Sequence, residues 1–461
     1  MNTLKNLPQG PKNHPLFQLF QWMNNTLEYM DTAQQKYGDL FTVCLGSKTQ
    51  PTVYVSNPEA IQQIFNGESK EFTNPGNQLF KPVLGQNALG TLTGKRHQRH
   101  RQLIMPCFHG NHLQAYAKLI CDTTEEMFKN LTAGQTFSAH TITEEISGKV
   151  ILKAVFGNHQ SLQQLNQLTS SVLDFFAKNP IASSLLFLPF LRTDLGRWSP
   201  WGYVCHLMRQ IDNFIYAEIA ERRQNFDPHR TDILNLLMAA KDEAGEGMSE
   251  QELRDELVML IFGGKDAVAS AMAWSLYWVN RSNNVQEKLQ KELMSIGSEE
   301  NPLNIARLPY LNAVCQEILR ISPVEIQGQP RIVSSPVELV GYKLPVGTVL
   351  IPSIYLVHRR EDLYPNPEQF KPERFLNQKF SYYEYLPFGG GSRRCIGSAF
   401  AQLTLKLFLA TTTSRYQLKL VSAQPVRPTL RGLNLIPHDG VKMTFLGQST
   451  MVSSPLSSAT V

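Results

Sequence analysis

Apolar positions recur at intervals of three and four residues through most of this chain, which is the pattern of helices packed against a core. Strict alternation of apolar and polar residues occurs only in two short segments, 39–45 and 52–56, which we predict to be paired strands. The pattern therefore predicts a mainly α (α+β) protein with small β sheets. We expect helices at about residues 26–36, 113–130, 140–156, 161–178 and 203–224.

The longest periodic segment begins after Ser249, where Glu252 completes the sequence of a capping box. Apolar residues then recur as far as Val279, which predicts one helix of about thirty residues. Gly263 and Gly264 lie at its middle. Each glycine costs a helix about 1 kcal/mol relative to alanine. A compensating reason is therefore expected, such as close packing against a neighbouring helix.

Four segments lack helical periodicity. Residues 5–15 are rich in proline and cannot be helical, and residues 74–94 carry many turn-forming residues and are predicted to be a loop. Residues 178–202 are apolar and interrupted by prolines, and the Ser/Thr-rich tail at 449–461 is predicted to be disordered. Residues 1–448 are expected to form a single domain.

Composition narrows the class of protein. The 461 residues are 42% hydrophobic and 18% charged, as in an ordinary globular chain. No apolar run approaches the roughly 18 residues of a transmembrane helix, and the N-terminus lacks the apolar region of a signal peptide. The net charge of +5 is too small to indicate nucleic-acid binding, but it favours an acidic partner. We expect a cytoplasmic monomer.

The six cysteines are scattered and form no C-x-x-C pair, which argues for a reducing compartment rather than for disulfides or a zinc site. Cys395 differs from the others because it follows three consecutive glycines and two arginines. Such glycines suggest a turn with positive φ or a backbone pressed against a flat group. A lone cysteine is usually a buried structural thiol. A cysteine at the start of a helix, however, is favoured as a thiolate, which can bind a soft metal.

The segment from Phe388 to Gly397 has the pattern Phe-x-x-Gly-x-Arg-x-Cys-x-Gly, which resembles the haem-binding loop of the cytochrome P450 monooxygenases. The resemblance implies the P450 fold, a helical bundle enclosing haem b, with Cys395 as the axial thiolate ligand of the iron. It also implies that Phe388 lies against the porphyrin and that Gly391 and Gly397 let the backbone approach it. Arg393 would pair with a haem propionate.

The basic segment 95–101 could be a solvated helix face or a nucleic-acid patch. With the cysteine loop present, it resembles the helix that flanks the haem in the same family. His97 and Arg101, four residues apart on one helix face, would then hold propionates. The outward cations Lys95, Arg96 and Arg99, together with Arg394, would face a redox partner.

Two further matches involve arginines. Glu317, Arg320 and Arg374 resemble the family's Glu–Arg–Arg triad, whose implied role is to fix the cysteine loop rather than to perform chemistry. Arg331 lies eleven residues after Arg320, where many family members place another propionate partner.

The middle of the long helix, from Gly263 to Asp266, resembles the family's oxygen-binding motif, Ala/Gly-Gly-x-Asp/Glu-Thr. There the small residues Gly263 and Gly264 open a groove for dioxygen and Asp266 relays protons. The sequence departs from the motif at its last position, where Ala267 replaces threonine. Alanine has no hydroxyl to form a hydrogen bond, so the usual relay is incomplete. The next hydroxyl, that of Ser270, is one turn away and is expected to point in a different direction.

The resemblance, which is to bacterial members including cyanobacterial ones, implies a haem-thiolate monooxygenase. Such an enzyme inserts one oxygen atom of O2 into a hydrophobic substrate, here a fatty acid, alkane or terpenoid. The chain has no fused electron-transfer module, so electrons would come from a separate ferredoxin and its NAD(P)H-dependent reductase. Segment 178–202 would form a lid over the distal pocket and could contact a membrane surface. A peroxygenase or isomerase, or a non-catalytic haem sensor, remain alternatives; Asp266 and the glycines argue against the sensor.

Overall fold

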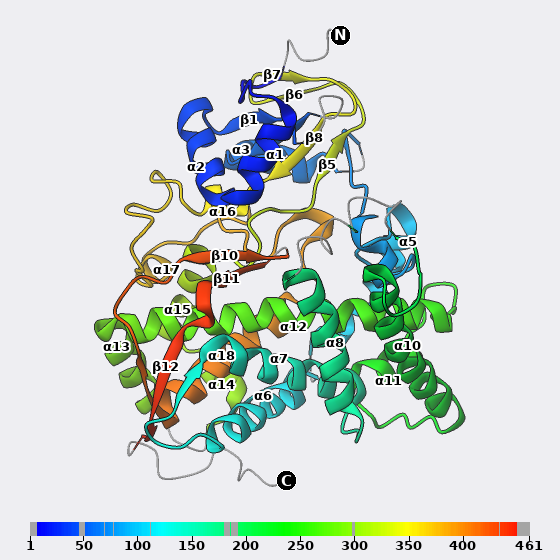
Figure 1. Ribbon diagram of the computed structural model, residues 1–461, viewed down its shortest axis with the longest axis vertical. Helices are drawn as coiled ribbons and strands as arrows, with labels where there is room; N and C mark the ends of the chain where they lie inside the picture. The colour runs from blue at the N-terminus through cyan, green and yellow to red at the C-terminus, as the bar shows by residue number, and fades with distance from the viewer. Residues whose placement is uncertain are drawn as a thin grey trace. The chain divides into compact units, whose positions relative to one another are not determined.

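Figure 1 shows the computed structural model of the chain. It describes residues 7–45, 51–68, 70–76, 78–110, 112–178, 185, 192–296, 300–432 and 434–449. The predicted disordered tail at 449–461 therefore lies outside the described residues except for its first residue, and so do residues 179–184 and 186–191 of the apolar segment at 178–202. The chain divides into two compact units. The sheet unit comprises Met1–Gly76 and Leu319–Cys395, and the helical unit comprises Asn77–Ile318 and Ile396–Val461.

The sheet unit is built on a five-stranded sheet with the strand order β1-β2-β8-β5-β3. The antiparallel pair of β1 (Leu40–Val43) and β2 (Thr52–Val55) confirms the two strands predicted from alternation. The other strands of this sheet are β3 (Phe72–Thr73), β5 (Arg331–Val333) and β8 (Val349–Pro352). A separate hairpin pairs β6 (Val337–Leu339) with β7 (Tyr342–Leu344).

The helices of the sheet unit are short, each of twelve residues or fewer. They are α1 (Pro15–Asn24), α2 (Thr26–Tyr37), α3 (Pro58–Asn66), α16 (Ile354–Val357) and α17 (Arg374–Asn377). Their core joins Val53 and Val55 of β2 to Ile61 and Ile64 of α3 and to Leu350 of β8, all of which are fully buried. This core anchors α3. Glu68, which binds the cysteine loop, lies two residues after the end of this helix.

The helical unit is organised around α12 (Glu250–Arg281), which packs against α7 (Ala139–Phe156) and α18 (Ser398–Arg415). Figure 1 shows α12 as the long green helix that passes behind α8 and α7. The other helices are α4 (Lys81–Leu84), α5 (Gly94–Ile104), α6 (His112–Lys129), α8 (Leu162–Lys178), α10 (Pro200–Gln224), α11 (Ile233–Ala239), α13 (Asn283–Met294) and α14 (Pro302–Ile305). Helix α15 (Pro309–Ile321) ends in the sheet unit.

Two small sheets complete the helical unit. One has the order β4-β12-β9, formed by Thr136–Ser138, Lys442–Gln448 and Tyr416–Leu420. The other is the hairpin of β10 (Pro428–Arg431) and β11 (Asn434–Pro437), which packs against α12. This hairpin supplies side chains to the candidate site.

The predicted helices are confirmed within a few residues of their ends. The prediction for residues 74–94 was wrong in part, because this segment contains the 3-10 helix η1 (Gln78–Phe80) as well as α4. Pro82 stands in the first turn of α4, where its missing N–H is not needed. A helix of four residues is too short to show a period in the sequence.

The long helix α12 begins as predicted, with Ser249 and Glu252 forming a complete capping box. Among the described helices, α12 alone is long and apolar enough to cross a membrane by length and composition. Of its most apolar window, however, 78% is buried inside the protein. The apolar residues of α12 are therefore explained by its packing against other helices of the protein.

Candidate active site

The cysteine loop of the sheet unit is closed by a backbone hydrogen bond, in which Cys395 N–H donates to the Phe388 carbonyl oxygen (3.0 Å). Gly389 and Gly391 lie in the left-handed region, with φ of 63° and 65°, which confirms the predicted turn with positive φ. The side chain of Cys395 is exposed, and Phe388 and Arg393 are half-buried. The loop therefore presents a thiol at its surface.

The other cysteines are poor candidates for a thiolate ligand. Burial raises the pKa of the thiols of Cys107 and Cys315 to about 12, and that of Cys121 to about 11. Burial also raises the pKa of Cys205. Because only the thiolate is a good metal ligand, these four thiols are disfavoured at neutral pH. Exposure distinguishes Cys395 from the buried cysteines, as the ligand role requires.

An ion pair that the sequence did not predict supports the cysteine loop. Arg331, which is only 1% exposed, donates through Nε to Glu68 Oε1 (2.6 Å), and its Nη2 contacts the same oxygen. The other Glu68 oxygen accepts the backbone N–H of Ser392 (2.7 Å). Arg331 Nη2 also reaches the Gly390 carbonyl (3.4 Å). The loop is thus held through both members of the pair.

The loop glycines pack closely against the same region. A β-carbon on Gly390 would lie 2.2 Å from the Phe65 ring, and one on Gly391 would lie 2.6 Å from the Glu68 carboxylate. Larger residues at either position would displace these groups. The structure therefore gives Gly391 a role in packing and backbone conformation, while its predicted approach to a porphyrin stays a prediction. A β-carbon on Gly397 would meet nothing within 4 Å.

Arg320 and Arg374 converge on one backbone segment, as their predicted shared structural role requires. Arg320 donates to the carbonyls of His358 (2.7 Å) and Pro367 (2.8 Å). Both arginines reach the carbonyl of Gln369, at 3.4 and 3.3 Å. Glu317, the third residue of the predicted triad, is fully buried on α15. The two buried arginines thus fix the backbone between residues 358 and 369, and their predicted role in fixing the cysteine loop stays a prediction.

Helix α5 places His97 and Arg101 on one face, as predicted, with His97 4% exposed. Lys95 and Arg96 are exposed, as expected of outward cations, but Arg99 differs from the prediction. Arg99 binds Asp242 (2.5 Å) and Glu252 (3.3 Å), so it does not face outward as a free cation for a partner. The reason is that the loop before α12 and the first turn of α12 each bring one acid next to α5.

His100, which the sequence analysis did not single out, joins α5 to α12. Its ring nitrogens lie 2.6 Å from Glu256 and 3.1 Å from Glu252. Burial raises the pKa of Glu256 although the hydrogen bond from His100 opposes this shift. The spacing of four residues between Glu252 and Glu256 on a helix was the one sequence signal that could have indicated a shared partner.

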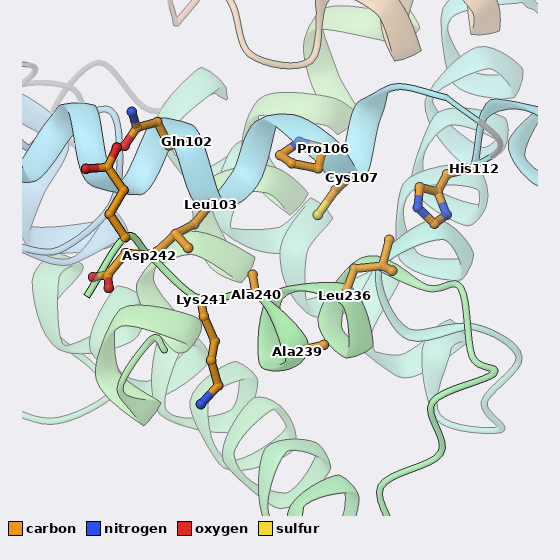
Figure 2. A pocket seen from close by; sticks show the side chains of 11 residues that line it. Gln102, Leu103, Pro106, Cys107, His112, Leu236, Ala239, Ala240, Lys241 and Asp242 are labelled. Carbon is orange, nitrogen blue, oxygen red and sulfur yellow. The ribbon is translucent and has the colours of Figure 1, made fainter. Parts of the chain in front are cut away.

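A cavity of about 500 Å³ lies beside the C-terminal end of α5 in the helical unit. Figure 2 shows it between Leu103, Pro106 and Cys107 on one side and α11 with residues Ala239–Asp242 on the other. Its cysteine, Cys107, is the buried thiol described above. This cavity contains none of the predicted site residues, and we assign it no role in the chemistry.

An accessible strip of small side chains interrupts the otherwise buried middle of α12. Gly263 is exposed and Ala267, one turn later, is half-buried. A β-carbon on Gly263 would meet nothing within 4 Å, whereas one on Gly264 would lie 2.9 Å from Ile151 of α7. Both reasons for a glycine pair therefore apply, because Gly264 allows close helix packing and Gly263 leaves space beside the helix.

Asp266 is 5% exposed and is held by the β10–β11 hairpin. Its Oδ2 accepts from Asn434 Nδ2 (2.7 Å), and its Oδ1 lies 3.6 Å from Arg431. Arg431 also binds Glu144 (3.2 Å) and Asp174. Three carboxylates thus share one guanidinium, a cluster that the sequence did not reveal because its members come from four distant elements.

Ser270 does not replace the missing threonine. Its hydroxyl donates to the Leu435 carbonyl (2.7 Å), which also accepts from Trp274 Nε1 (2.9 Å). Ser270 is therefore committed to fixing the hairpin on α12, and the expectation that it points elsewhere is confirmed.

Lys265, the residue between Gly264 and Asp266, is fully buried and points to α8. Its ammonium lies within hydrogen-bond distance of Asn166 Oδ1 (2.6 Å), Ser170 Oγ (2.6 Å) and Thr169 Oγ1 (3.2 Å). Burial lowers the pKa of Lys265 to about 8. Lys265 therefore links α12 to α8 next to the small-residue strip.

Two observations fit the haem that the sequence implies. In the sheet unit, an exposed cysteine lies on a loop that glycine conformation and an ion pair hold in place. In the helical unit, the position of Gly263 leaves space that any larger side chain would fill. A soft sulfur donor with Arg393 two residues before it in the sequence suits an iron porphyrin that carries carboxylates.

Comparison with known proteins agrees with these features. Residues 8–445 match the family model described as Cytochrome P450. Cytochrome P450 135B1 of Mycobacterium tuberculosis is 31% identical over 439 residues, which cover 95% of this chain and 91% of the relative. Cytochrome P450 138 of Mycobacterium bovis is 30% identical over 441 residues, which cover 95% and 96%.

Among solved structures, the retinoic acid-bound cyanobacterial CYP120A1 superposes with a TM-score of 0.84 at 22% identity. The match covers 96% of this chain and 99% of that protein, which confirms the predicted fold. The family match likewise confirms the resemblance first seen in the cysteine loop. The chain therefore belongs to the cytochrome P450 family of haem-thiolate monooxygenases.

Proposed function

We propose that this cytochrome P450 oxidises a hydrophobic substrate of the fatty acid, alkane or terpenoid class, with electrons from a separate ferredoxin and its NAD(P)H-dependent reductase. The observation that carries the proposal is the exposed Cys395 on a loop fixed by the Glu68–Arg331 ion pair. The strip of Gly263 and Ala267 supports an apolar substrate, because it presents no polar side chain.

Haem b, when bound, supplies the activation of O2 that gives this family its monooxygenase chemistry. The chain's part is to bind and orient it. Cys395 would ligate the iron, Phe388 would lie against the porphyrin, and Gly391 and Gly397 would allow close approach. His97, Arg101 and Arg393 would hold propionates. Arg331 would also hold a propionate while it keeps its ion pair with Glu68.

Asp266 is proposed to deliver protons. Its partner Arg431 is bound in turn by Asp174, whose side chain is 36% exposed, and by Glu144, at 19%. These acids form a graded path from the solvent to Asp266. Since an arginine does not give up its proton at neutral pH, Arg431 holds the carboxylates in place, and proton movement passes between the acids or through water.

Beside Ala267, a hydroxyl or carboxyl of the substrate is proposed to take the place of the missing threonine. The structure supports this idea by showing Ser270 engaged elsewhere. The same missing hydroxyl favours, as the second candidate, a peroxygenase or isomerase that needs no proton relay of this kind.

Electron delivery is proposed to involve the exposed cations Lys95 and Arg96 of α5. Arg99 is excluded from this surface by its ion pairs with Asp242 and Glu252. Arg394 of the cysteine loop lies over the Tyr382 ring, which leaves its charge near the protein surface. An acidic ferredoxin is the complementary partner.

Helix α1 is proposed to place the protein at a membrane surface. The helix carries no charged residue, and Leu16, Phe17, Phe20 and Met23 are 61%, 50%, 60% and 68% exposed. These positions recur with helical spacing and form one apolar face. An uncharged, exposed apolar face suits the boundary of a lipid bilayer.

Substitution of Cys395 tests the ligand. Carbon monoxide opposite a thiolate gives ferrous haem a displaced Soret band near the wavelength that names the family. We expect this band in the wild type, and we expect Cys395→Ser and Cys395→His to abolish it while some haem stays bound. Cys205→Ser serves as the control. A band that persists in the Cys395 variants would show that another residue ligates the iron.

Coupling of reductant use to product formation tests the proton path. The measurement is the NAD(P)H consumed per product for a hydroxylated substrate and for its matched deoxy analogue. In the wild type this ratio should be close to one only for the hydroxylated substrate. Ala267→Thr should lower the ratio mainly for the deoxy analogue. Asp266→Asn should slow ferredoxin-driven turnover by about tenfold or more, with little effect on peroxide-driven turnover. Equal coupling for both substrates in the wild type would refute substrate assistance.

Sedimentation with phospholipid vesicles tests helix α1. Phe17→Ser combined with Phe20→Ser should weaken partition into neutral vesicles by about a hundredfold or more, because burying each phenylalanine side chain contributes about 1.5–3 kcal/mol. Phe226→Ser, which changes a 45% exposed phenylalanine outside α1, is the matched control. Equal partition of all three proteins would contradict the membrane-surface proposal.

A further inference from the structure

His140 is a buried histidine that the proton path described above does not use. It is the second residue of α7 and is 6% exposed. Its Nδ1 lies 3.8 Å from Oε2 of Glu144, one turn further along the helix. Its Nε2 is buried and has no hydrogen-bond partner within the described part of the chain. A neutral imidazole has one nitrogen that can accept a proton, so this histidine has an unused capacity to hold one.

The surrounding structure fixes the place of His140 beside Glu144. Thr143, one turn along α7, donates through Oγ1 to the Ala269 carbonyl of α12 (2.9 Å). From another direction, a β-carbon on Gly440 would lie 3.3 Å from the β-carbon of His140. The turn of α7 that carries the imidazole is thus held by two other parts of the helical unit.

The acids that face His140 are those that surround Arg431 of β10. They are Glu144 of α7, Asp174 of α8 and Asp266 of α12. Oδ1 of Asp266 is, like His140 Nε2, a buried polar atom for which the described residues supply no hydrogen-bond partner, although it lies 3.6 Å from Arg431. The two orphaned atoms therefore belong to one cluster.

The cluster carries more negative than positive charge. Besides Arg431, the buried ammonium of Lys265 acts on the same three carboxylates. Two cations against three carboxylates leave one negative charge, which one bound proton would offset. The other element with titratable groups at the start of α7 is η5 (His438–Gly440), where His438 and Asp439 are exposed and lie 3.1 Å from each other. Their charges offset each other in water.

His140 responds to the charge of the cluster. Burial lowers the pKa of its imidazole, and Arg431 acts in the same direction, whereas Glu144, Asp266 and Asp174 oppose this shift. The imidazole is therefore favoured in its neutral form while a carboxyl of the cluster holds a proton. It is favoured as a cation once that proton has left, because the carboxylates then attract it more strongly.

We propose that His140 and Asp266 share one proton, so that His140 reloads Asp266 after Asp266 has given its proton up. This inference rests on the proposed proton path and names the group that refills it. A neutral pair and a pair of imidazolium and carboxylate have the same net charge, so moving the proton between them leaves the buried charge unchanged. Each proton that Asp266 delivers is replaced by one from water, taken up through Glu144, whose side chain is 19% exposed. His140 thus acts through Asp266.

The first test is an NMR titration of the His140 ring in the ferrous–carbon monoxide holoprotein, which is diamagnetic. The signal of His140 is identified by its loss in His140→Gln. Asp266→Asn removes a charge that favours the imidazolium, so the midpoint of the His140 titration should move to lower pH by about one unit. Asp439→Asn, at an exposed acid of η5, is the matched control and should leave the midpoint unchanged.

Turnover gives a second, independent readout. His140→Gln should slow ferredoxin-driven turnover about tenfold and leave peroxide-driven turnover nearly unchanged, whereas damage to the fold would lower both. Substitutions on one path are not additive, so His140→Gln combined with Asp266→Asn should be no slower than Asp266→Asn alone. His206→Gln, at a histidine of α10 outside the cluster, is the control.

An unchanged His140 midpoint in Asp266→Asn would overturn the proposal, and so would a double variant in which the two effects on turnover multiply. Asp266→Asn alone tests the proposed function separately, because it leaves His140 in place. If Asp266→Asn slows ferredoxin-driven turnover and His140→Gln does not, the proton path through Asp266 stands and the role of His140 is refuted.

Discussion

The Glu68–Arg331 ion pair is the contact on which the cysteine loop depends. Consecutive glycines make the loop costly to order, because glycine loses more conformational freedom on folding than any other residue. The pair offsets that cost by binding the loop at the Ser392 N–H and at the Gly390 carbonyl. Removal of one member of a buried pair typically costs about 3–5 kcal/mol, since the other charge is left without compensation. A fixed thiol position follows from this arrangement.

Helix α12 combines three different environments within two turns. Gly264 packs on α7, Lys265 reaches α8, and Asp266 is held by the β10–β11 hairpin. The remaining direction, that of Gly263 and Ala267, stays accessible. The polar residues around the helix thus fix its position, while its open side is formed from the smallest side chains. One set of faces of α12 therefore holds the helix in place, and a different face leaves space beside it.

The fold could be predicted well from the sequence, because long helices such as α12 show many repeats of their period and the cysteine loop has a distinctive motif. Short elements such as α4 show no period. The glycines at 263 and 264 stood out in the sequence, but their separate packing environments depend on which neighbour each one faces in the fold. The partners of Arg331 and Asp266 could not be predicted, since Glu68 and Arg431 are more than 150 residues away from them in sequence and only the folded chain brings them close.

The most direct test of this account is the ferrous–carbon monoxide spectrum of Glu68→Gln, compared with wild type and with the exposed control Glu71→Gln. If the Glu68–Arg331 pair holds the thiolate of Cys395 in position, Glu68→Gln should retain haem in the absence of urea. Its displaced Soret band should then be lost at a lower urea concentration than in the other two proteins. A displaced band of equal size and equal resistance to urea in all three proteins would contradict the account.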